Sequence, residues 1–144
     1  MIDTPSLTLA QADQIISSAL AAARVAGFPA MAVVVLDAAG NPVALKREDG
    51  ASMLRVDIAT SKAWAAVGMG VASRVLHQRA LDNPPFFNAL ASSSHGKFIP
   101  QTGAVVIKRA DGLVIGAVGA SGGSGADDEQ ICSAGVAAAG LVVG

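Results

Sequence analysis

Lys62 is the residue whose type and surroundings point most directly to chemistry. On a helix, its neighbours three and four positions away are small or apolar: Ile58, Ala59, Ala65 and Ala66. An ammonium in this setting could hold a carboxylate, or act as a base if its pKa were depressed. It could equally lay its stem along a helix edge and keep its charge in water. Either way, we expect truncation of Lys62 to leave the fold intact, because alanine favours helix and no large cavity would form.

Asp49 and Arg47 lie in the segment "REDGAS", between a predicted strand end and a predicted helix start. Asp49 could pair with Lys62 or with another basic side chain, but a carboxylate beside Gly50 is also typical of a turn. Arg47 has the same two interpretations, because an arginine at a strand end commonly points into solvent. We favour a turn role for Asp49 and a solvated position for Arg47, and we keep both as candidate ligand-binding residues.

His77 and His95 are the only imidazoles in the chain, and so the only histidine candidates for a general base or an iron ligand. The neighbours of His77 within "SRVLHQRAL" are largely polar, which favours a solvated helix face. His95 lies in a predicted loop beside Phe98, where it could help to cover a pocket, so we rank it above His77. The single cysteine, Cys132, excludes an internal disulfide and a cysteine-based zinc site.

The stretch "VIGAVGASGGSGADDEQ", residues 114–130, has the strand–loop–helix order of a phosphate-binding loop. Its glycines follow G-x-x-G-x-x-G rather than G-x-G-x-x-G, and no G-K-[S/T] comes after them. The acidic run that opens the predicted helix would also repel a phosphate there. The sequence therefore predicts no nucleotide site. Ser124 is expected to cap the helix through Asp127, and Ser121 and Asp128 to flank the turn, either as structural residues or as part of a pocket.

These residues need a scaffold, and the pattern of the chain predicts one domain over residues 1–144. A T-x-x-Q capping box at Thr8 starts the first helix, and Gly27 ends it. Two strand pairs follow the pattern of hairpins, the second turning at Asp111-Gly112. The predicted class is α+β, with an antiparallel sheet built from two hairpins packed with helices. The predicted elements are strands over 31–36 and 43–46, helices over 52–67 and 73–81, a loop-rich segment over 82–103, a hairpin over 104–119, and a last helix over 126–142.

The composition limits the classes of partner. Of the 144 residues, 52% are hydrophobic and only 15% are charged, so a monomer would expose apolar surface and we expect a homo-oligomer. A net charge of −1 without a basic stripe argues against nucleic acid. The longest apolar runs, 63–72 and 134–143, are shorter than the ~20 residues that span a bilayer. The N-terminal residues do not read as a signal peptide, so we expect a cytoplasmic protein that does not enter a membrane.

Taken together, several segments resemble the GlcG/HbpS-like heme-binding family, which is related to the C-terminal domain of PduO-type proteins. They are "VVVLDAAGNPVALKREDGAS", "IATSKAWAA" and "GLVIGAVGASGGSGADDEQICSAG", in this order over most of the chain. The resemblance implies a profilin-like α+β fold, a compact oligomer that is often an octamer, and binding of heme or a related tetrapyrrole in some members. It also implies a pocket that Ser121 and Asp128 share with Lys62. The absence of C-x-x-C-H excludes covalent heme attachment.

The chain departs from this family pattern at the entry to the second hairpin. The family often has P-G-G-V, whereas this sequence reads "IPQTGAVVI", with Gly103 kept and Gln101-Thr102 substituted. We place the rim of the pocket here, so the departure bears on which ligand binds.

Three functions are compatible with these residues. The first is binding of heme or a similar tetrapyrrole, with Phe86, Phe87 and Phe98 over a flat ligand and Lys62 or Lys97 at its propionates. The second is a cofactor-independent enzyme for a small carboxylate or carbonyl compound, in which Lys62 works with Asp49 or Asp128 as acid and base. The third is a structural or regulatory oligomer. The candidate ligand-binding set is Lys62, Asp49, Arg47, His95, Phe98, Gly103, Ser121 and Asp128, with His95 as the weak candidate for heme iron.

Overall fold

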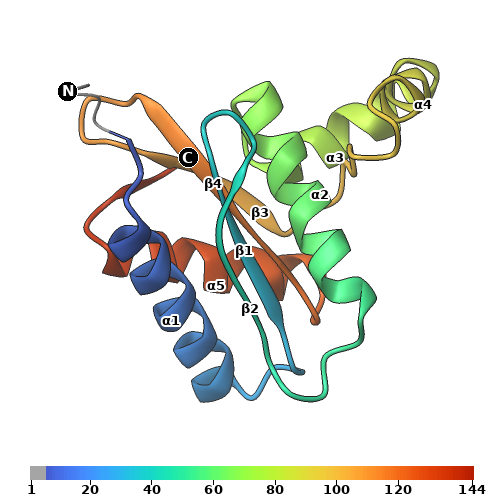
Figure 1. The fold of residues 1–144 in the computed structure, drawn as a ribbon. Helices are drawn as coiled ribbons and strands as arrows, with labels where there is room; N and C mark the ends of the chain where they lie inside the picture. Colours follow the sequence, from blue (N-terminus) through green and yellow to red (C-terminus); the bar gives the residue numbers. More distant parts are fainter. Residues whose placement is uncertain (1–5) are drawn as a thin grey trace.

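A computed structural model describes residues 6–144 as five helices and one five-stranded sheet (Figure 1). Residues 1–5, on which part of the signal-peptide expectation rests, lie outside this range. The helices are α1 (Leu9–Ala26), α2 (Leu54–Met69), α3 (Ser73–Asp82), α4 (Pro84–Ser93) and α5 (Gly125–Ala138). The strands are β1 (Ala32–Asp37), β2 (Pro42–Arg47), β3 (Ala104–Lys108), β4 (Val114–Ser121) and β5 (Val142–Val143).

The sheet has the order β2-β1-β4-β3-β5, and all neighbouring strands are antiparallel. The predicted hairpins are β1–β2 and β3–β4, and they join through β1 and β4 in the middle of the sheet. Helices α1 and α5 pack together on one face, and α2 lies across the other (Figure 1). The α+β prediction is therefore confirmed.

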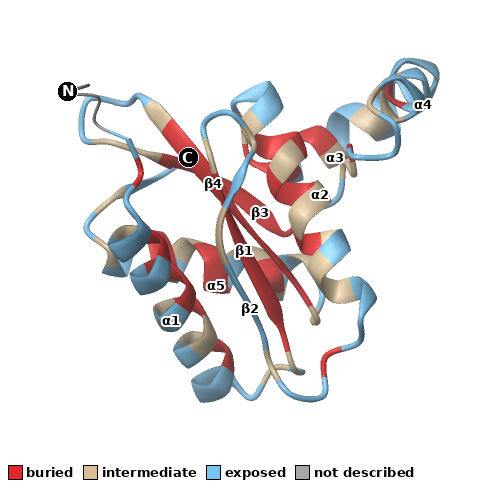
Figure 2. Cartoon of the chain, in the orientation of Figure 1, coloured by how far each residue is buried: buried red, intermediate tan, exposed pale blue. Residues whose placement is uncertain are grey.

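Strand β1 is buried on both faces, which explains why its sequence does not alternate between apolar and polar residues. Val33 and Val35 belong to the core beneath α1 and α5, while Val34 and Leu36 pack with α2. Figure 2 shows the contrast between these buried central strands and the mostly exposed edge strand β2. The site described below lies where the buried strand β4 ends.

Two helix starts form as the sequence predicts. The Thr8 hydroxyl accepts from the backbone N–H of Gln11, and the Gln11 side chain accepts in return from the backbone N–H of Thr8, each at 3.0 Å. Gly27 ends this helix in the left-handed conformation, with a φ of 71°. Ser124 accepts from the backbone N–H of Asp127 at 3.1 Å, so the predicted cap of the last helix is also confirmed.

Two predictions about elements are wrong. The segment 82–103 was predicted to be loop-rich, but it contains α4. The two prolines of α4 occupy its first turn, where a missing N–H costs nothing. The last helix was predicted to reach Val142, but α5 ends at Ala138 and Gly140 turns the chain with a φ of 74°. Val142 and Val143 then pair with β3 at the edge of the sheet.

Helix α4 projects from the rest of the molecule on α3 (Figure 1). It is attached through a small cluster in which Phe87 and Phe98 pack with Leu76 and Ala65. None of the helices in residues 6–144 combines the length and the apolar character needed to cross a membrane.

Candidate functional site

Lys62 and Asp128 form a buried ion pair. The Lys62 Nζ lies 3.0 Å from Asp128 Oδ2 and also donates to the Ala120 carbonyl at 3.0 Å. The second carboxylate oxygen of Asp128 accepts from the backbone N–H of Gly123 at 2.9 Å. The two side chains are only 7% and 2% exposed. Lys62 is therefore not a solvated residue at a helix edge, and the pair ties α2, the end of β4 and the start of α5 together.

Small residues allow this pair to form at the junction of the three elements. Gly119 has no side chain where α2 crosses β4, and a Cβ there would lie 2.3 Å from the Ala59 carbonyl oxygen. Gly103, with a φ of 136°, lies directly behind the pair, and a Cβ there would lie 2.5 Å from the Lys62 Nζ. At Gly119 the added Cβ would collide with backbone that cannot move aside, so glycine is required there. At Gly103 it would displace the Lys62 ammonium, and the backbone conformation there is one that other residues rarely adopt.

The environment of Asp128 changes its proton affinity. Burial raises the pKa of Asp128, because the ionised carboxylate loses contact with water. The Lys62 ammonium, the Gly123 N–H and the more distant Arg55 favour the ionised form and offset part of this rise. Burial also raises the pKa of the Cys132 thiol far above its usual range, so this thiol stays protonated.

The ion pair forms one wall of a pocket of about 600 Å³, which we call the Lys62 pocket. Its polar lining comes from four segments: the first half of α2, the face of α3, the approach to β3, and the turn into α5. These four segments are far apart along the chain. The lining comprises Arg55, Ile58, Lys62, Arg74, His77, Gln101, Thr102, Ser121, Gly123, Gly125, Ala126, Asp128 and Glu129.

Two further contacts organise the rim of the Lys62 pocket. The Arg55 guanidinium donates from Nη1 to the Ser121 hydroxyl at 3.2 Å. Arg74, on α3, forms an ion pair with Glu129 at 3.2 Å between Nε and Oε1. Ser121 is buried, so it lies at the base of the rim rather than on a solvated turn.

The two histidines lie in different surroundings. His77 is partly buried and lines the Lys62 pocket, with its Nδ1 3.3 Å from the carbonyl oxygen of Pro100. When Nδ1 carries the proton for this bond, Nε2 is left as a lone-pair donor. His95 is exposed after α4, in a left-handed conformation with a φ of 56°, and lines none of the pockets described here. The geometry therefore favours His77, which sequence analysis ranked second.

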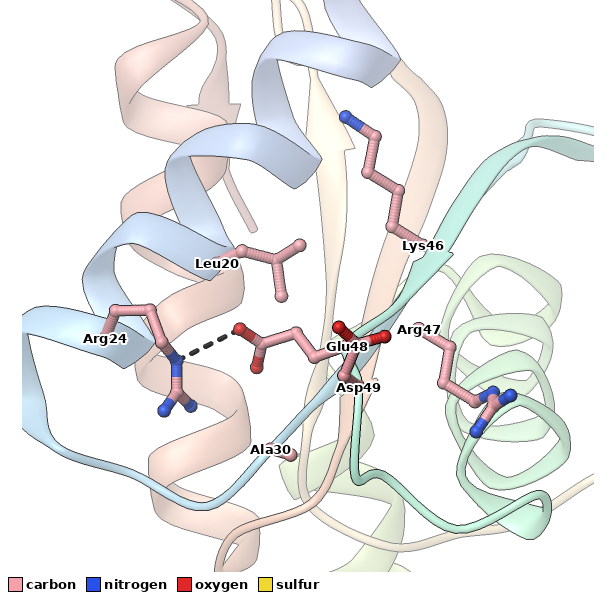
Figure 3. A pocket seen from close by; sticks show the side chains of 7 residues that line it. All are labelled: Leu20, Arg24, Ala30, Lys46, Arg47, Glu48 and Asp49. Atoms are coloured by element: carbon pink, nitrogen blue, oxygen red, sulfur yellow. Dashed lines mark ion pairs between the residues drawn. The ribbon is translucent and has the colours of Figure 1, made fainter.

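Arg47 and Asp49 line a second pocket, of about 700 Å³, between α1 and the end of β2 (Figure 3). We call it the Arg24 pocket. Arg24 pairs with Glu48 at 3.0 Å and also donates to the Phe28 and Pro29 carbonyls, while the side chains of Lys46 and Arg47 point away from this pair. Arg47 instead donates to the carbonyl of Ala51 at 2.6 Å. The structure therefore does not bring Asp49 to Lys62, which has Asp128 as its partner.

Seven of the eight predicted residues separate into three groups, and His95 lies apart from them on an exposed turn. Lys62, Ser121 and Asp128 meet at one pocket, and Gly103 lies directly behind the Lys62–Asp128 pair. Phe98 is buried in the cluster with Phe87, so neither ring is free to cover a ligand, and Phe86 is half exposed on α4. Arg47 and Asp49 line the Arg24 pocket instead.

Sequence analysis missed Arg55 and Arg74. Arg55 precedes Lys62 by seven positions, which is two helical turns, so the spacing alone places both on one face of α2. That signal was available. Arg74 could not be found in this way, because its place at the pocket depends on how α3 packs on α2 and β3, which brings Arg74 to Glu129 of α5.

No cluster of three or more His, Cys, Asp or Glu side chains able to hold a metal ion occurs within residues 6–144.

Comparison with known proteins gives a consistent result. The family described as "Haem degrading protein HbpS-like" matches residues 7–137. Two corrinoid adenosyltransferases PduO are similar in sequence. The protein from Salmonella typhimurium is 32% identical over 106 residues, 74% of this chain and 31% of the relative. The protein from Citrobacter freundii is 29% identical over 133 residues, 92% and 39% respectively. The chain therefore spans about a third of the length of these relatives.

Among solved structures, a PduOC:heme complex superposes with a TM-score of 0.84 at 29% identity, covering 96% of this chain and 97% of the other. HbpS gives a TM-score of 0.81 at 28% identity, covering 95% and 92%. Klebsiella pneumoniae ORFY, at 23% identity and a TM-score of 0.84, supports the fold alone.

Proposed function

The chain belongs to the HbpS-like haem-degrading protein family, and on that premise we propose that it binds heme or a related tetrapyrrole in the Lys62 pocket. The similarity to a protein crystallised as a heme complex supports the ligand class. The lining of the pocket supports this location for the ligand, because the lining combines an imidazole with cationic side chains. Heme carries an iron that accepts an imidazole nitrogen and two propionates that pair with cations.

The observation that carries this proposal is the orientation of His77. Its Nδ1 is engaged by the Pro100 carbonyl at 3.3 Å, which is the second contact that commonly fixes the ring of a metal-ligating histidine. Nε2 is then the nitrogen that would bind iron. The cationic groups Arg55, Lys62 and Arg74 line the same pocket, so a ligand held at His77 has positive charge within the same cavity for its carboxylates.

A hemin titration followed by absorbance tests the proposal. We expect the parent protein to shift the Soret band saturably. We expect His77→Ala to bind more weakly and to give an altered iron spectrum, because the proposed axial nitrogen is gone. His95→Ala is the matched control, since it removes the other imidazole from an exposed turn and should titrate as the parent does. A parent protein that leaves the hemin spectrum unchanged would refute the proposal, and equal titration of both variants would remove His77 as the iron ligand.

We also propose that several copies of the chain assemble. Large apolar side chains are more than half exposed on α1, α2, α3 and α4, including Leu9, Val25, Leu54, Leu81 and Phe86. Their number on one small chain favours coverage by further copies rather than by water. Light scattering at micromolar concentration should give a mass of at least two chains, and a stable monomer would contradict the proposal.

A further inference from the structure

We infer that Arg55, rather than Lys62, is the residue that binds a carboxylate of the ligand in the Lys62 pocket. This inference rests on the proposed function, and it assigns to Arg55 the carboxylate contact that sequence patterns predict for Lys62. It follows from the charge balance of the pocket and from the contacts that each cation already makes.

Two of the three cationic side chains in the Lys62 pocket already have a carboxylate partner. Lys62 has Asp128 as its partner at 3.0 Å, and Arg74 has Glu129 at 3.2 Å. Within residues 6–144, Arg55 has no carboxylate at ion-pair distance. The lining thus holds three cationic side chains and two carboxylates. One more positive than negative charge thus lines the pocket, and Arg55, which acts on Asp128 only from beyond ion-pair distance, is the cation without a carboxylate partner of its own.

Arg55 lies in the first turn of α2 and is partly buried, and its guanidinium donates to the hydroxyl of Ser121 at 3.2 Å. That bond fixes one edge of the guanidinium. A guanidinium has five N–H donors, and the remaining ones suit the two oxygens of a carboxylate. Ser121 therefore acts as a positioning residue, and Arg55 as the binding residue.

Lys62 stabilises the wall of the pocket instead. Its ammonium holds the Ala120 carbonyl and Asp128, and Asp128 in turn holds the Gly123 N–H at 2.9 Å. These contacts set the path of the chain from β4 through Ser121 into α5. Gly125 and Ala126, at the start of α5, line the same pocket and have N–H groups with no carbonyl partner inside the helix. The pair thus shapes the wall against which Arg55 holds its ligand.

The ligand group that fits is a single carboxylate with apolar matter attached. A phosphate ester carries roughly two negative charges. It would place them beside the carboxylates of Asp128 and Glu129, with one unpaired cation to balance them. A carboxylate brings one charge. Ile58 lines the pocket three residues after Arg55 and offers an apolar contact next to that charge. For a tetrapyrrole, the group would be one propionate.

The test compares hemin with hemin dimethyl ester, which keeps the iron and the ring but carries no propionate charge. We expect Arg55→Gln to weaken binding of hemin by about 10- to 100-fold, the range of a charged hydrogen bond. Binding of the dimethyl ester should be the same in Arg55→Gln and in the parent, within about twofold. Arg109→Gln is the matched control, because it removes the same charge from the β3–β4 hairpin, outside the Lys62 pocket, and should leave both titrations unchanged.

Arg55→Lys separates charge from geometry. Lysine keeps the charge but lacks the planar fork, so binding of hemin should fall between those of the parent and Arg55→Gln. Thermal melting of each variant checks the fold, which we expect to be retained because Arg55 is only partly buried. If the parent binds hemin and Arg55→Gln binds it equally well, the assignment of Arg55 is wrong while the proposed function stands. If the parent binds no hemin, the proposed function fails and the assignment fails with it.

Discussion

The Lys62 pocket and the Arg24 pocket have similar volumes and are both lined by side chains of both signs, but their ion pairs differ in exposure. The Lys62 and Asp128 side chains are 7% and 2% exposed, whereas those of Arg24 and Glu48 are 48% and 19% exposed. Each charged group of a buried pair has lost its hydration and depends on the opposite charge, while the groups of a more exposed pair keep part of their hydration. Two pairs of a cation and a carboxylate therefore have different roles in the two pockets.

The contacts around each pair show the consequence. In the Arg24 pocket, Arg24 also holds the Phe28 and Pro29 carbonyls, and Glu48 also accepts from the backbone N–H of Met31 at 2.9 Å. These contacts fasten the end of α1 to the end of β2. In the Lys62 pocket, the buried pair fixes the turn into α5. Among residues 6–144, Arg55 has no carboxylate at ion-pair distance. The two pockets therefore differ in the burial of their ion pairs rather than in their balance of charge, because three cationic and two acidic side chains line each of them.

The largest effect that separates the two pockets should come from Lys62→Met. The variant keeps much of the packing of the stem but leaves the Asp128 carboxylate buried without its ammonium. We expect the free energy of unfolding to fall by about 3–5 kcal/mol, measured by urea denaturation. This reverses the expectation from sequence that the fold would not depend on Lys62.

The matched control is Glu48→Gln, which removes one charge of the exposed pair. It should cost less than about 1 kcal/mol and cost less still at high salt. If the two variants lost similar amounts of stability, the contrast between the pockets would be wrong.

A smaller effect should come from Gly103→Ala, which presses on the same pair from behind. A Cβ at this position would lie 2.5 Å from the Lys62 Nζ, and the φ of 136° is one that other residues rarely adopt. We expect a loss of about 2–3 kcal/mol. Gly96→Ala is the comparison, because Gly96 also has a positive φ, of 77°, but has no atom within 4 Å of the added Cβ. It should lose about 1 kcal/mol. Equal losses would show that only the backbone matters at Gly103.

Local signals in the sequence predicted much of the fold. The capping box at Thr8, the stop at Gly27 and the Ser124 cap depend on residues three or four positions apart, and all three form. The start of α4 was missed because two prolines suggest a loop, although they also suit the first turn of a helix. The end of α5 was missed because Val142 and Val143 continue an apolar helical pattern, and only pairing with β3 makes them a strand.

The site was predicted in part, from the family resemblance rather than from local signals. The resemblance implied that Lys62 shares a pocket with Ser121 and Asp128, and the structure places the three together. The partner of Lys62 was left open between Asp49 and Asp128, since neither is close to it in sequence. Asp49 lies nearer along the chain, but only the packing of α2 on β4 decides that Asp128 is the residue within reach.

We propose that the ligand binds in the Lys62 pocket rather than in the Arg24 pocket. Paramagnetic broadening of backbone amide signals by ferric hemin distinguishes the two pockets, because the broadening falls steeply with distance from the iron. We expect the amides of His77 and Thr102 to broaden first as hemin is added, while those of Leu20 and Lys46 remain sharp. Broadening of Leu20 and Lys46 with His77 and Thr102 unaffected would contradict it.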